Sequence, residues 1–311
     1  MCIYEGNAGR IKMKKIAVLL IVVAGTLWGI IGYFVRTLQE NSIDSMQIVA
    51  IRMTISALVF SLYAVVFNRK LFKIKLKHLW CFIGSGVVSV AVFSFCYFKC
   101  IQYSSLSMAS ILLYTAPIFV MLFSIFLFKE KLTLTKFLSL LMAFCGCLFV
   151  TGVFTQNVVI NVVAVVFGVM SGVCYALYSI FSRLALDRGY SPLSITLYTF
   201  IFSSVASLLV IDVQPVLEFM TQSTYNFLYC ILFALLSSVV PYVTYTLALK
   251  YVKPTTASIV ASIEPVVATV MGALVFDEAV QVPYGYIGIA LVIGSIILIN
   301  LIPENKKKAH E

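Results

Sequence analysis

Ala109-Ser110-Ile111 returns 148 residues later as Ala257-Ser258-Ile259, and this spacing runs through the chain. The same shift places Pro117 on Pro265, Phe128 on Phe276, Glu130 on Glu278 and Gly146 on Gly294. A shift of 147 places Gly25 on Gly172, aromatic Trp28 on aromatic Tyr175, and Arg36 on Arg183. The sequence therefore contains two copies of one unit, and the content of that unit decides the fold.

The composition is that of a membrane protein. Hydrophobic residues make up 62% of the 311 positions, charged residues only 11%, and the mean hydropathy is +1.06. A soluble domain of this length cannot bury so much apolar surface, so we expect an all-α integral membrane protein. No segment alternates in the way of a membrane β-barrel. The net charge of +10 sits in short clusters between apolar runs, so no nucleic-acid partner is predicted.

Ten apolar segments are each about 20 residues long, enough to cross roughly 30 Å of hydrocarbon as a helix. They lie near residues 16–36, 46–67, 79–101, 107–128, 134–151, 161–184, 193–213, 225–249, 256–276 and 282–302. The first copy, 16–151, and the second, 161–302, hold five segments each. Because five is odd, the second copy must enter the membrane from the opposite side. We therefore predict ten transmembrane helices in two inverted five-helix repeats, an arrangement that recurs in secondary transporters.

Lysine and arginine predict the orientation. Nineteen of the 22 fall on one side of the predicted bilayer, within residues 10–15, 69–77, 129–136, 183–188, 250–253 and 306–308. The positive-inside rule then places both terminal segments, 1–15 and 303–311, in the cytoplasm and the protein in the cytoplasmic membrane. The first apolar run is too long for a cleaved signal peptide. Met13 offers an alternative start to Met1.

Residue patterns for catalysis or metal binding are missing from the sequence. Cys96/Cys100 and Cys145/Cys147 are the only close cysteine pairs, and neither has His or acidic neighbours at metal-ligand spacing, so we interpret the eight cysteines as small hydrophobic residues rather than metal ligands. No HExxH pattern, Ser-His-Asp arrangement or GxxxxGK[ST] loop occurs. We predict no enzyme, no metal and no cofactor. A channel is disfavoured because no filter segment is visible.

A pattern in the fourth and fifth segments carries a family resemblance. Tyr114-Thr-Ala-Pro117, Phe128-Lys-Glu130-Lys-Leu132 and Gly146 recur as Ile263-Glu264-Pro265, Phe276-Asp-Glu278 and Gly294. With Thr26-Leu-Trp28-Gly29 and Arg52, the pattern resembles the EamA-type transporters of the drug/metabolite transporter superfamily, over residues 16–302. The resemblance implies helices 1–4 and 6–9 around a central cavity, helices 5 and 10 at the periphery, and export of small metabolites such as amino acids without ATP. The copies differ at one position, since Ala116 stands where the second has Glu264.

Glu264 is the main candidate for substrate binding or coupling. It lies eight residues into the predicted ninth span, about 12 Å along a helix, near the bilayer midplane. A carboxylate there is costly unless it is paired, hydrated or protonated. It could bind a proton or a substrate amine, or it could hydrogen-bond a neighbouring helix in a structural or gating role.

Two equivalent prolines are candidate hinges. Pro117 and Pro265 each remove a backbone donor and should free the carbonyl four residues earlier, on Leu113 and Ala261. Those carbonyls could accept hydrogen bonds from substrate or water, or the kinks could serve packing alone. Tyr114 precedes the first proline. Ser110 and Ser258 occupy matching places one to two turns earlier, where a small hydroxyl side chain could bind substrate or allow close packing.

Aromatic and basic side chains are further candidates. We expect Trp28 and Tyr175 towards opposite halves of the membrane, where they could close the cavity alternately or stack on a substrate. Tyr97 and Tyr245 are expected nearer the surfaces, in the aromatic belt. Arg52, about 10 Å down the second span, could anchor a substrate carboxylate or extend to the surface. Glu130 and Glu278 precede helices 5 and 10, where they would complement the helix dipoles.

The sequence favours a secondary transporter that exports small metabolites such as amino acids by alternating access. The alternative is proton-coupled efflux of lipophilic cations or drugs, which Glu264 with aromatic neighbours would suit. A non-transporting scaffold or receptor is the alternative from another class. The expected partners are a small-molecule substrate and the lipid bilayer. A monomer is sufficient because one chain carries both copies, and a dimer remains compatible with the sequence.

Overall fold

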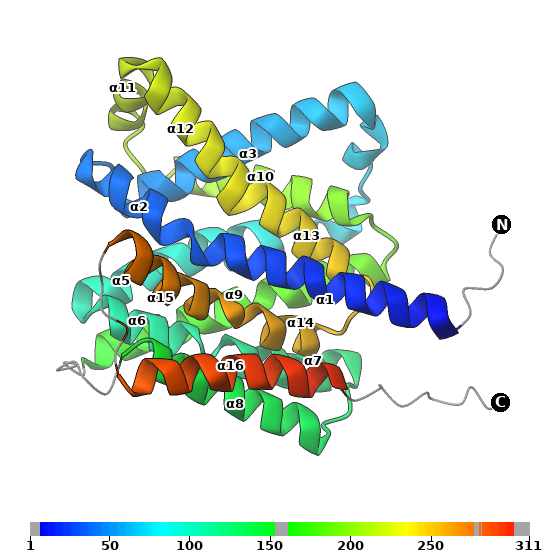
Figure 1. Ribbon diagram of the computed structural model, residues 1–311. Helices are drawn as coiled ribbons and strands as arrows, with labels where there is room; N and C mark the ends of the chain where they lie inside the picture. Colours follow the sequence, from blue (N-terminus) through cyan, green and yellow to red (C-terminus); the bar gives the residue numbers. More distant parts are fainter. Residues whose placement is uncertain (1–6, 153–160, 277–279, 281, 302–311) are drawn as a thin grey trace.

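The computed structural model describes residues 7–152, 161–276, 280 and 282–301, and every regular element in this part of the chain is a helix (Figure 1). Eight helical segments are long and apolar enough to span a membrane: Lys12–Glu40, Ser45–Phe67, Leu76–Tyr103, Leu106–Phe128, Val162–Asp187, Thr224–Leu249, Pro254–Val275 and Tyr284–Leu301. Two further apolar helices, Leu134–Val150 and Pro192–Leu208, have 17 residues each. The chain is therefore a multi-pass membrane protein.

The first copy contains α1 to α8. Its elements are α1 (Asn7–Gly29), α2 (Ile31–Glu40), α3 (Ser45–Phe67), the 3-10 turns η1 (Arg69–Phe72) and η2 (Leu76–His78), α4 (Leu79–Ile83), the π-helix η3 (Gly84–Val92), α5 (Phe93–Tyr103), α6 (Leu106–Leu113), α7 (Ala116–Phe128) and α8 (Leu134–Val150). The second copy follows the same order. It contains α9 (Val162–Asp187), α10 (Pro192–Leu208), α11 (Gln214–Gln222), α12 (Thr224–Ala234), the π-helix η4 (Leu235–Val239), α13 (Val240–Leu249), α14 (Pro254–Ala261), α15 (Ile263–Val275) and α16 (Tyr284–Leu301).

Two helix irregularities recur at equivalent positions. The π-helices η3 and η4 fall in the third span of each copy, and a shift of 148 makes them overlap. The fourth span is interrupted before Pro117, between α6 and α7, and again before Pro265, between α14 and α15. The predicted kinks are thus present, because proline has no N–H and its ring collides with the carbonyl four residues earlier.

The observed boundaries differ from the expected ones in three places. α1 begins at Asn7 rather than near residue 16, so the helix includes the basic residues before the first apolar run. The first span continues as α2 to Glu40 and ends shortly before Asp44, which caps α3 through a capping box with Gln47. The seventh segment stops at Leu208. The short helix α11 follows it, and the Gln214 N–H donates to the Asp212 side chain at 3.0 Å.

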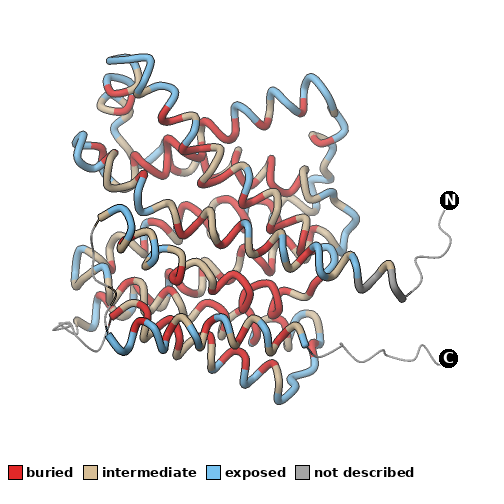
Figure 2. The backbone as a smooth tube through the Cα atoms, viewed as in Figure 1, coloured by how far each residue is buried: buried red, intermediate tan, exposed pale blue. Residues whose placement is uncertain are grey.

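Helices of each copy pack against several helices of the other copy, so the two copies do not form separate bundles. α1 contacts α13, α14 and α15 of the second copy, and α9 contacts α5, α6 and α7 of the first. α3 pairs with α10, and α8 pairs with α16 at one edge of the bundle (Figure 1). Buried residues follow the middle of the bundle in Figure 2, while exposed ones lie on the outer faces and at the ends. The core therefore belongs to both copies.

The two ends of the bundle are packed differently. We call the end that gathers loops 68–78, 129–133, 188–191 and 250–253 the lysine-rich end, on the right in Figure 1. There α14 packs against α7, and α13 packs against α9. The repeat-related pairs at the opposite end, α6 with α15 and α2 with α5, make no comparable contact within the described residues. The bundle is therefore closed more tightly at its lysine-rich end.

Candidate functional site

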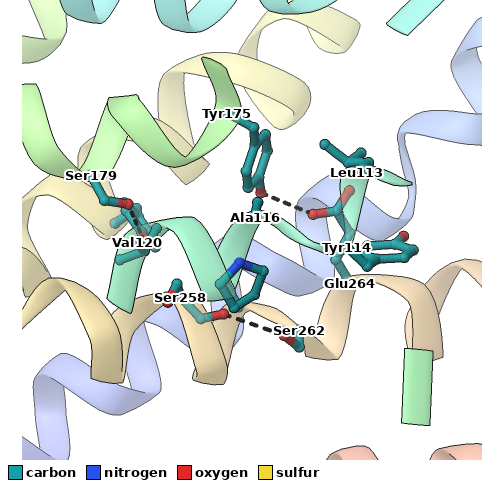
Figure 3. A pocket seen from close by; sticks show the side chains of 12 residues that line it. Leu113, Tyr114, Ala116, Val120, Tyr175, Ser179, Ser258, Ser262 and Glu264 are labelled. Atoms are coloured by element: carbon teal, nitrogen blue, oxygen red, sulfur yellow. Dashed lines mark hydrogen bonds between the residues drawn. The ribbon is translucent and has the colours of Figure 1, made fainter. Parts of the chain in front are cut away.

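A small pocket lies where the interrupted spans of both copies meet (Figure 3). Its lining comes from α6, α7, α9, α13, α14, α15 and the interruptions between them: Leu113, Tyr114, Ala116, Pro117, Val120, Tyr175, Ser179, Tyr245, Ser258, Ala261, Ser262 and Glu264. The free volume is about 20 Å³, which is room for about one water molecule. The side chains therefore nearly fill the site in this conformation.

Side-chain hydroxyls satisfy backbone groups at both interruptions. Thr115 Oγ1 donates to the Leu112 carbonyl at 2.5 Å, and Ser262 Oγ donates to the Ser258 carbonyl at 3.3 Å (Figure 3). Such bonds partly replace those that a helix loses at a proline. The interruptions are thus stabilised locally, which leaves their polar backbone next to the pocket.

A glycine from the other copy covers each interruption. A Cβ on Gly172 would lie 2.7 Å from Thr115 Oγ1 and 2.8 Å from the Leu112 carbonyl oxygen. A Cβ on its repeat partner, Gly25, would lie 2.5 Å from Ile263 Cγ2 and 3.2 Å from the Ala261 carbonyl oxygen. Only glycine permits this approach, which explains why the residue recurs in both first helices. The repeat revealed the pair, but not what each glycine contacts.

Glu264 points into the pocket from the first turn of α15 (Figure 3). Its Oε2 accepts a hydrogen bond from the Tyr175 hydroxyl at 3.2 Å, so two of the candidates from the sequence are in contact. The hydroxyls of Tyr97, Tyr114 and Tyr242 also lie near enough to interact electrostatically with the carboxylate. Glu264 therefore bonds one tyrosine of α9 and interacts electrostatically with tyrosines of α5, of α13 and of the interruption between α6 and α7.

Arg52 is a buried cation beside this site. It is only 9% exposed, which argues against extension to the membrane surface, and its Nε has no hydrogen-bond partner within the described residues. Its charge acts on Tyr242 and on Glu264, although it forms no ion pair with the latter. Positive and negative side chains therefore face the same region without neutralising each other directly.

Trp28 and Tyr175, expected towards opposite halves of the membrane, lie in contact with each other. Their ring centroids lie 6.4 Å apart, and Trp28 also contacts Tyr242 at 5.5 Å and Tyr245 at 5.4 Å. The first helix of each copy packs against the other copy, which brings the two rings together. The aromatic-belt interpretation of Tyr245 is wrong, since this residue is 3% exposed and lines the pocket.

Three hydrogen bonds close the lysine-rich side of the site. They join α9 to α13: Tyr178 to Thr246 at 2.6 Å, Ser179 to Tyr245 at 2.7 Å, and Arg183 Nη1 to the Leu249 carbonyl at 2.9 Å. In the first copy the positions of Tyr178 and Ser179 are Ile31 and Gly32, which have no hydroxyl. Sequence reasoning missed this group, although the polar-to-apolar difference between the copies was visible.

The remaining candidates are divided between the pocket and its surroundings. Tyr114, Pro117 and Ser258 line it, Pro265 follows Glu264 directly, and Ser110 lies outside the lining, where its hydroxyl bonds Tyr97 at 3.2 Å. Glu278 falls outside the described residues. Within 7–152, 161–276, 280 and 282–301 no three His, Cys, Asp or Glu side chains gather in a way that could hold a metal ion.

Comparison with known proteins shows which family this chain belongs to. A multi-pass helical bundle with a buried polar pocket is typical of membrane transporters, and transporters are what the chain matches. The sequence model of the EamA-like transporter family fits residues 15–152 and, a second time, residues 162–301. The chain belongs to this family, in agreement with the resemblance to EamA-type members of the drug/metabolite transporter superfamily. The family and the relatives are transporters, not enzymes.

Relatives and a solved structure support the same fold. An uncharacterized transporter of Clostridium kluyveri is 27% identical over 271 residues, which cover 83% of this chain and 85% of that protein. One of Archaeoglobus fulgidus is 28% identical over 216 residues, 68% of this chain and 75% of the relative. The uncharacterized transporter YxxF of Bacillus subtilis strain 168 is 22% identical and is covered to 90%. A crystal structure with 18% identity superposes with a TM-score of 0.72 over 92% of this chain and 96% of its own, which demonstrates the shared fold alone.

Proposed function

We propose that this protein is a secondary carrier that moves small metabolites across the cytoplasmic membrane by alternating access. The eight long helical segments and the two 17-residue helices together supply ten spans, since 17 residues lie at the lower limit for crossing. α1 and α9 run in opposite directions in Figure 1, which supports two inverted five-helix repeats. The basic loops gathered at one end support a cytoplasmic location for that end and for both termini.

The main support for this proposal is that the bundle is packed more tightly at its lysine-rich end than at the opposite end. Contacts between α7 and α14 and between α9 and α13 close the lysine-rich end, while the repeat-related pairs at the other end make no comparable contact within the described residues. Because the two copies are equivalent in sequence, each can adopt the conformation of the other. The protein would then have a second state in which the opposite end is sealed and the lysine-rich end is open. A duplicated bundle with only a scaffolding role has no need for such a difference between equivalent contacts.

An amino acid or related zwitterion is the substrate class that we propose first. Glu264 would receive the amine, and Arg52 would receive the carboxylate, because Arg52 is buried and Glu264 half-buried, each without a direct ionic partner of opposite sign. The direction, export, follows from the family resemblance. The second candidate is proton-coupled efflux of lipophilic cations, which the tyrosine rings around Glu264 favour, since cations bind aromatic faces.

Transport into proteoliposomes tests the carrier proposal. Labelled amino acids and cationic dyes would be compared for counterflow, with and without a pH gradient. Saturable counterflow of one of them supports a carrier. Currents far above carrier turnover would indicate a channel, and an absence of flux for all substrates would favour a scaffold or receptor.

Glu264→Gln tests the coupling role in the same vesicles. The substitution keeps the shape and a hydrogen-bond acceptor for Tyr175, but removes the ionisable group. We expect transport to lose its response to the pH gradient. Glu218→Gln, the same change at an exposed position of α11, is the matched control. Unchanged pH dependence in Glu264→Gln would rule out coupling through this residue.

A further inference from the structure

A buried ion pair lies at the lysine-rich end of the bundle. Glu130 and Lys136 are 6% and 7% exposed, and Glu130 Oε2 lies 3.3 Å from Lys136 Nζ. The left-handed backbone of Lys129, with φ of 50°, ends α7 and turns the chain back, and the Glu130 N–H donates to the Ser124 carbonyl at 3.1 Å. The local backbone therefore directs this carboxylate into the protein rather than towards solvent.

The same carboxylate reaches the second copy. Thr255, fully buried in the first turn of α14, donates its hydroxyl to Glu130 Oε2. Lys136 belongs to the first copy, as Glu130 does, and its ammonium also donates to the Lys131 carbonyl at 3.3 Å. Glu130 is thus the point at which the two copies are joined by a hydrogen bond where α14 meets α7.

Helix capping does not account for Glu130. The side chain of Thr133 caps α8 by accepting from the Lys136 N–H at 3.3 Å, so Glu130 is not the capping residue of this helix. Burying an ion pair costs desolvation energy, and the attraction between the two charges seldom compensates for it. The location supplies a reason, because the α7–α14 contact lies at the lysine-rich end and its repeat-related pair, α6 with α15, makes no comparable contact within the described residues.

We infer that Glu130, Lys136 and Thr255 form a latch between the copies that holds the lysine-rich end closed and opens once in every transport cycle. Opening moves α14 away from α7, so the Thr255–Glu130 hydrogen bond breaks. The Lys136–Glu130 pair stays intact because both residues move with the first copy. Lys136 therefore balances the charge of Glu130 in both states. Each opening breaks one hydrogen bond and leaves no buried charge unpaired.

The repeat agrees with a device of this kind. The carboxylate and the hydroxyl recur in the sequence at equivalent positions, as Glu278 and Ser107, whereas Lys136 is replaced by Tyr284. The latch rests on the proposed alternating access, since a bundle without two states has nothing for it to hold.

Distances between spin labels measure the latch directly. One label pair, at Lys131→Cys and Tyr251→Cys, spans the latch from exposed positions in the first and second copies. A second pair, at Leu106→Cys and Leu274→Cys, reports on the opposite end. Both would be placed in a chain without its native cysteines, reconstituted in lipid, and read by pulsed electron paramagnetic resonance.

Thr255→Val removes the hydroxyl with little change in volume, and Glu130→Gln removes the charge with little change in shape. We expect Thr255→Val to raise the ratio of open to closed protein at the lysine-rich end about fivefold, as loss of one net hydrogen bond predicts. Glu130→Gln keeps an acceptor for Thr255 but weakens the bond by removing the charge, so it should raise the ratio by less. The double variant should add little to Thr255→Val alone, because both substitutions act on one contact. Thr244→Val is the matched control, since its hydroxyl bonds only carbonyls of its own helix segment.

The opposite end distinguishes a latch from ordinary packing. If the three residues form a latch, the distance between the labels at positions 106 and 274 shortens as the distance between those at 131 and 251 lengthens. Simple loosening would instead broaden the distance distribution of the pair at 131 and 251 alone. Unchanged distances in Thr255→Val, or broadening at one end only, would overturn the latch even if transport is normal. Absence of transport with reciprocal distance changes would instead count against the proposed function and leave the latch standing. Thr255→Val keeps the test decisive if Glu130→Gln does not fold.

Discussion

Replacing Gly172 with alanine should force α9 away from the interruption between α6 and α7. The new methyl group would lie 2.8 Å from the Leu112 carbonyl oxygen, a backbone atom that cannot rotate aside, and 2.7 Å from Thr115 Oγ1. Overpacking of this kind costs about 1 to 3 kcal/mol. Against it stands the higher helix propensity of alanine, worth about 1 kcal/mol. The net effect ranges from near zero to about 2 kcal/mol of destabilisation.

Gly32→Ala isolates the steric part of that balance. Gly32 lies in α2, where an added Cβ would meet nothing within 4 Å, so alanine there gains helix propensity alone. The two variants should therefore differ by about 1 to 3 kcal/mol in stability.

Thermal unfolding in detergent, with transport in proteoliposomes, would measure the difference. We expect Gly172→Ala to melt several degrees below Gly32→Ala and to transport more slowly, because α9 also carries Tyr175. Equal melting temperatures and equal transport would refute the close packing of α9 on the interruption. Gly25→Ala, the repeat-related change, should behave like Gly172→Ala, because its methyl group would approach Ile263 Cγ2 and the Ala261 carbonyl.

Three other substitutions test the site. Tyr175→Phe removes the hydroxyl that donates to Glu264 at 3.2 Å and should reduce substrate affinity or transport rate about tenfold, since hydrogen bonds to charged groups are worth about 1.5 kcal/mol or more; full activity would show that this bond is unimportant. Ser179→Ala leaves the buried Tyr245 hydroxyl without its 2.7 Å partner and should make the lysine-rich end more accessible to water-soluble thiol reagents at an engineered cysteine, whereas Ser203→Ala, which loses only carbonyl bonds within its own helix, should not. Arg52→Gln should abolish transport of carboxylate-bearing substrates while leaving the melting temperature nearly unchanged, because no described residue bonds its Nε; a large loss of stability would indicate a structural role instead.

The sequence by itself determined the membrane character and the duplication. Both follow from local facts: apolar runs of sufficient length, and identities such as Pro117 with Pro265 at a constant shift. The helix interruptions were also predictable, because a missing N–H at proline acts on its own helix whatever surrounds it. Glu264 was recognisable as a site residue because a carboxylate in an apolar span is costly wherever the span packs.

The sequence could not show which side chains meet. Trp28 and Tyr175 were expected towards opposite halves of the membrane and lie in contact, and Tyr245 was expected nearer the surface and is buried. Contacts between spans depend on how each helix is rotated and on which helices of the other copy it meets. The equivalence of the copies also concealed their difference: the repeat assigns the same neighbours to both ends, while the described part of the folded chain is packed more tightly at the lysine-rich end. Glu130 shows the limit most clearly. Its position before a helix suggested a dipole role, and only the tertiary structure, by placing Thr255 of the second copy against its carboxylate, gave this residue a partner 125 positions away.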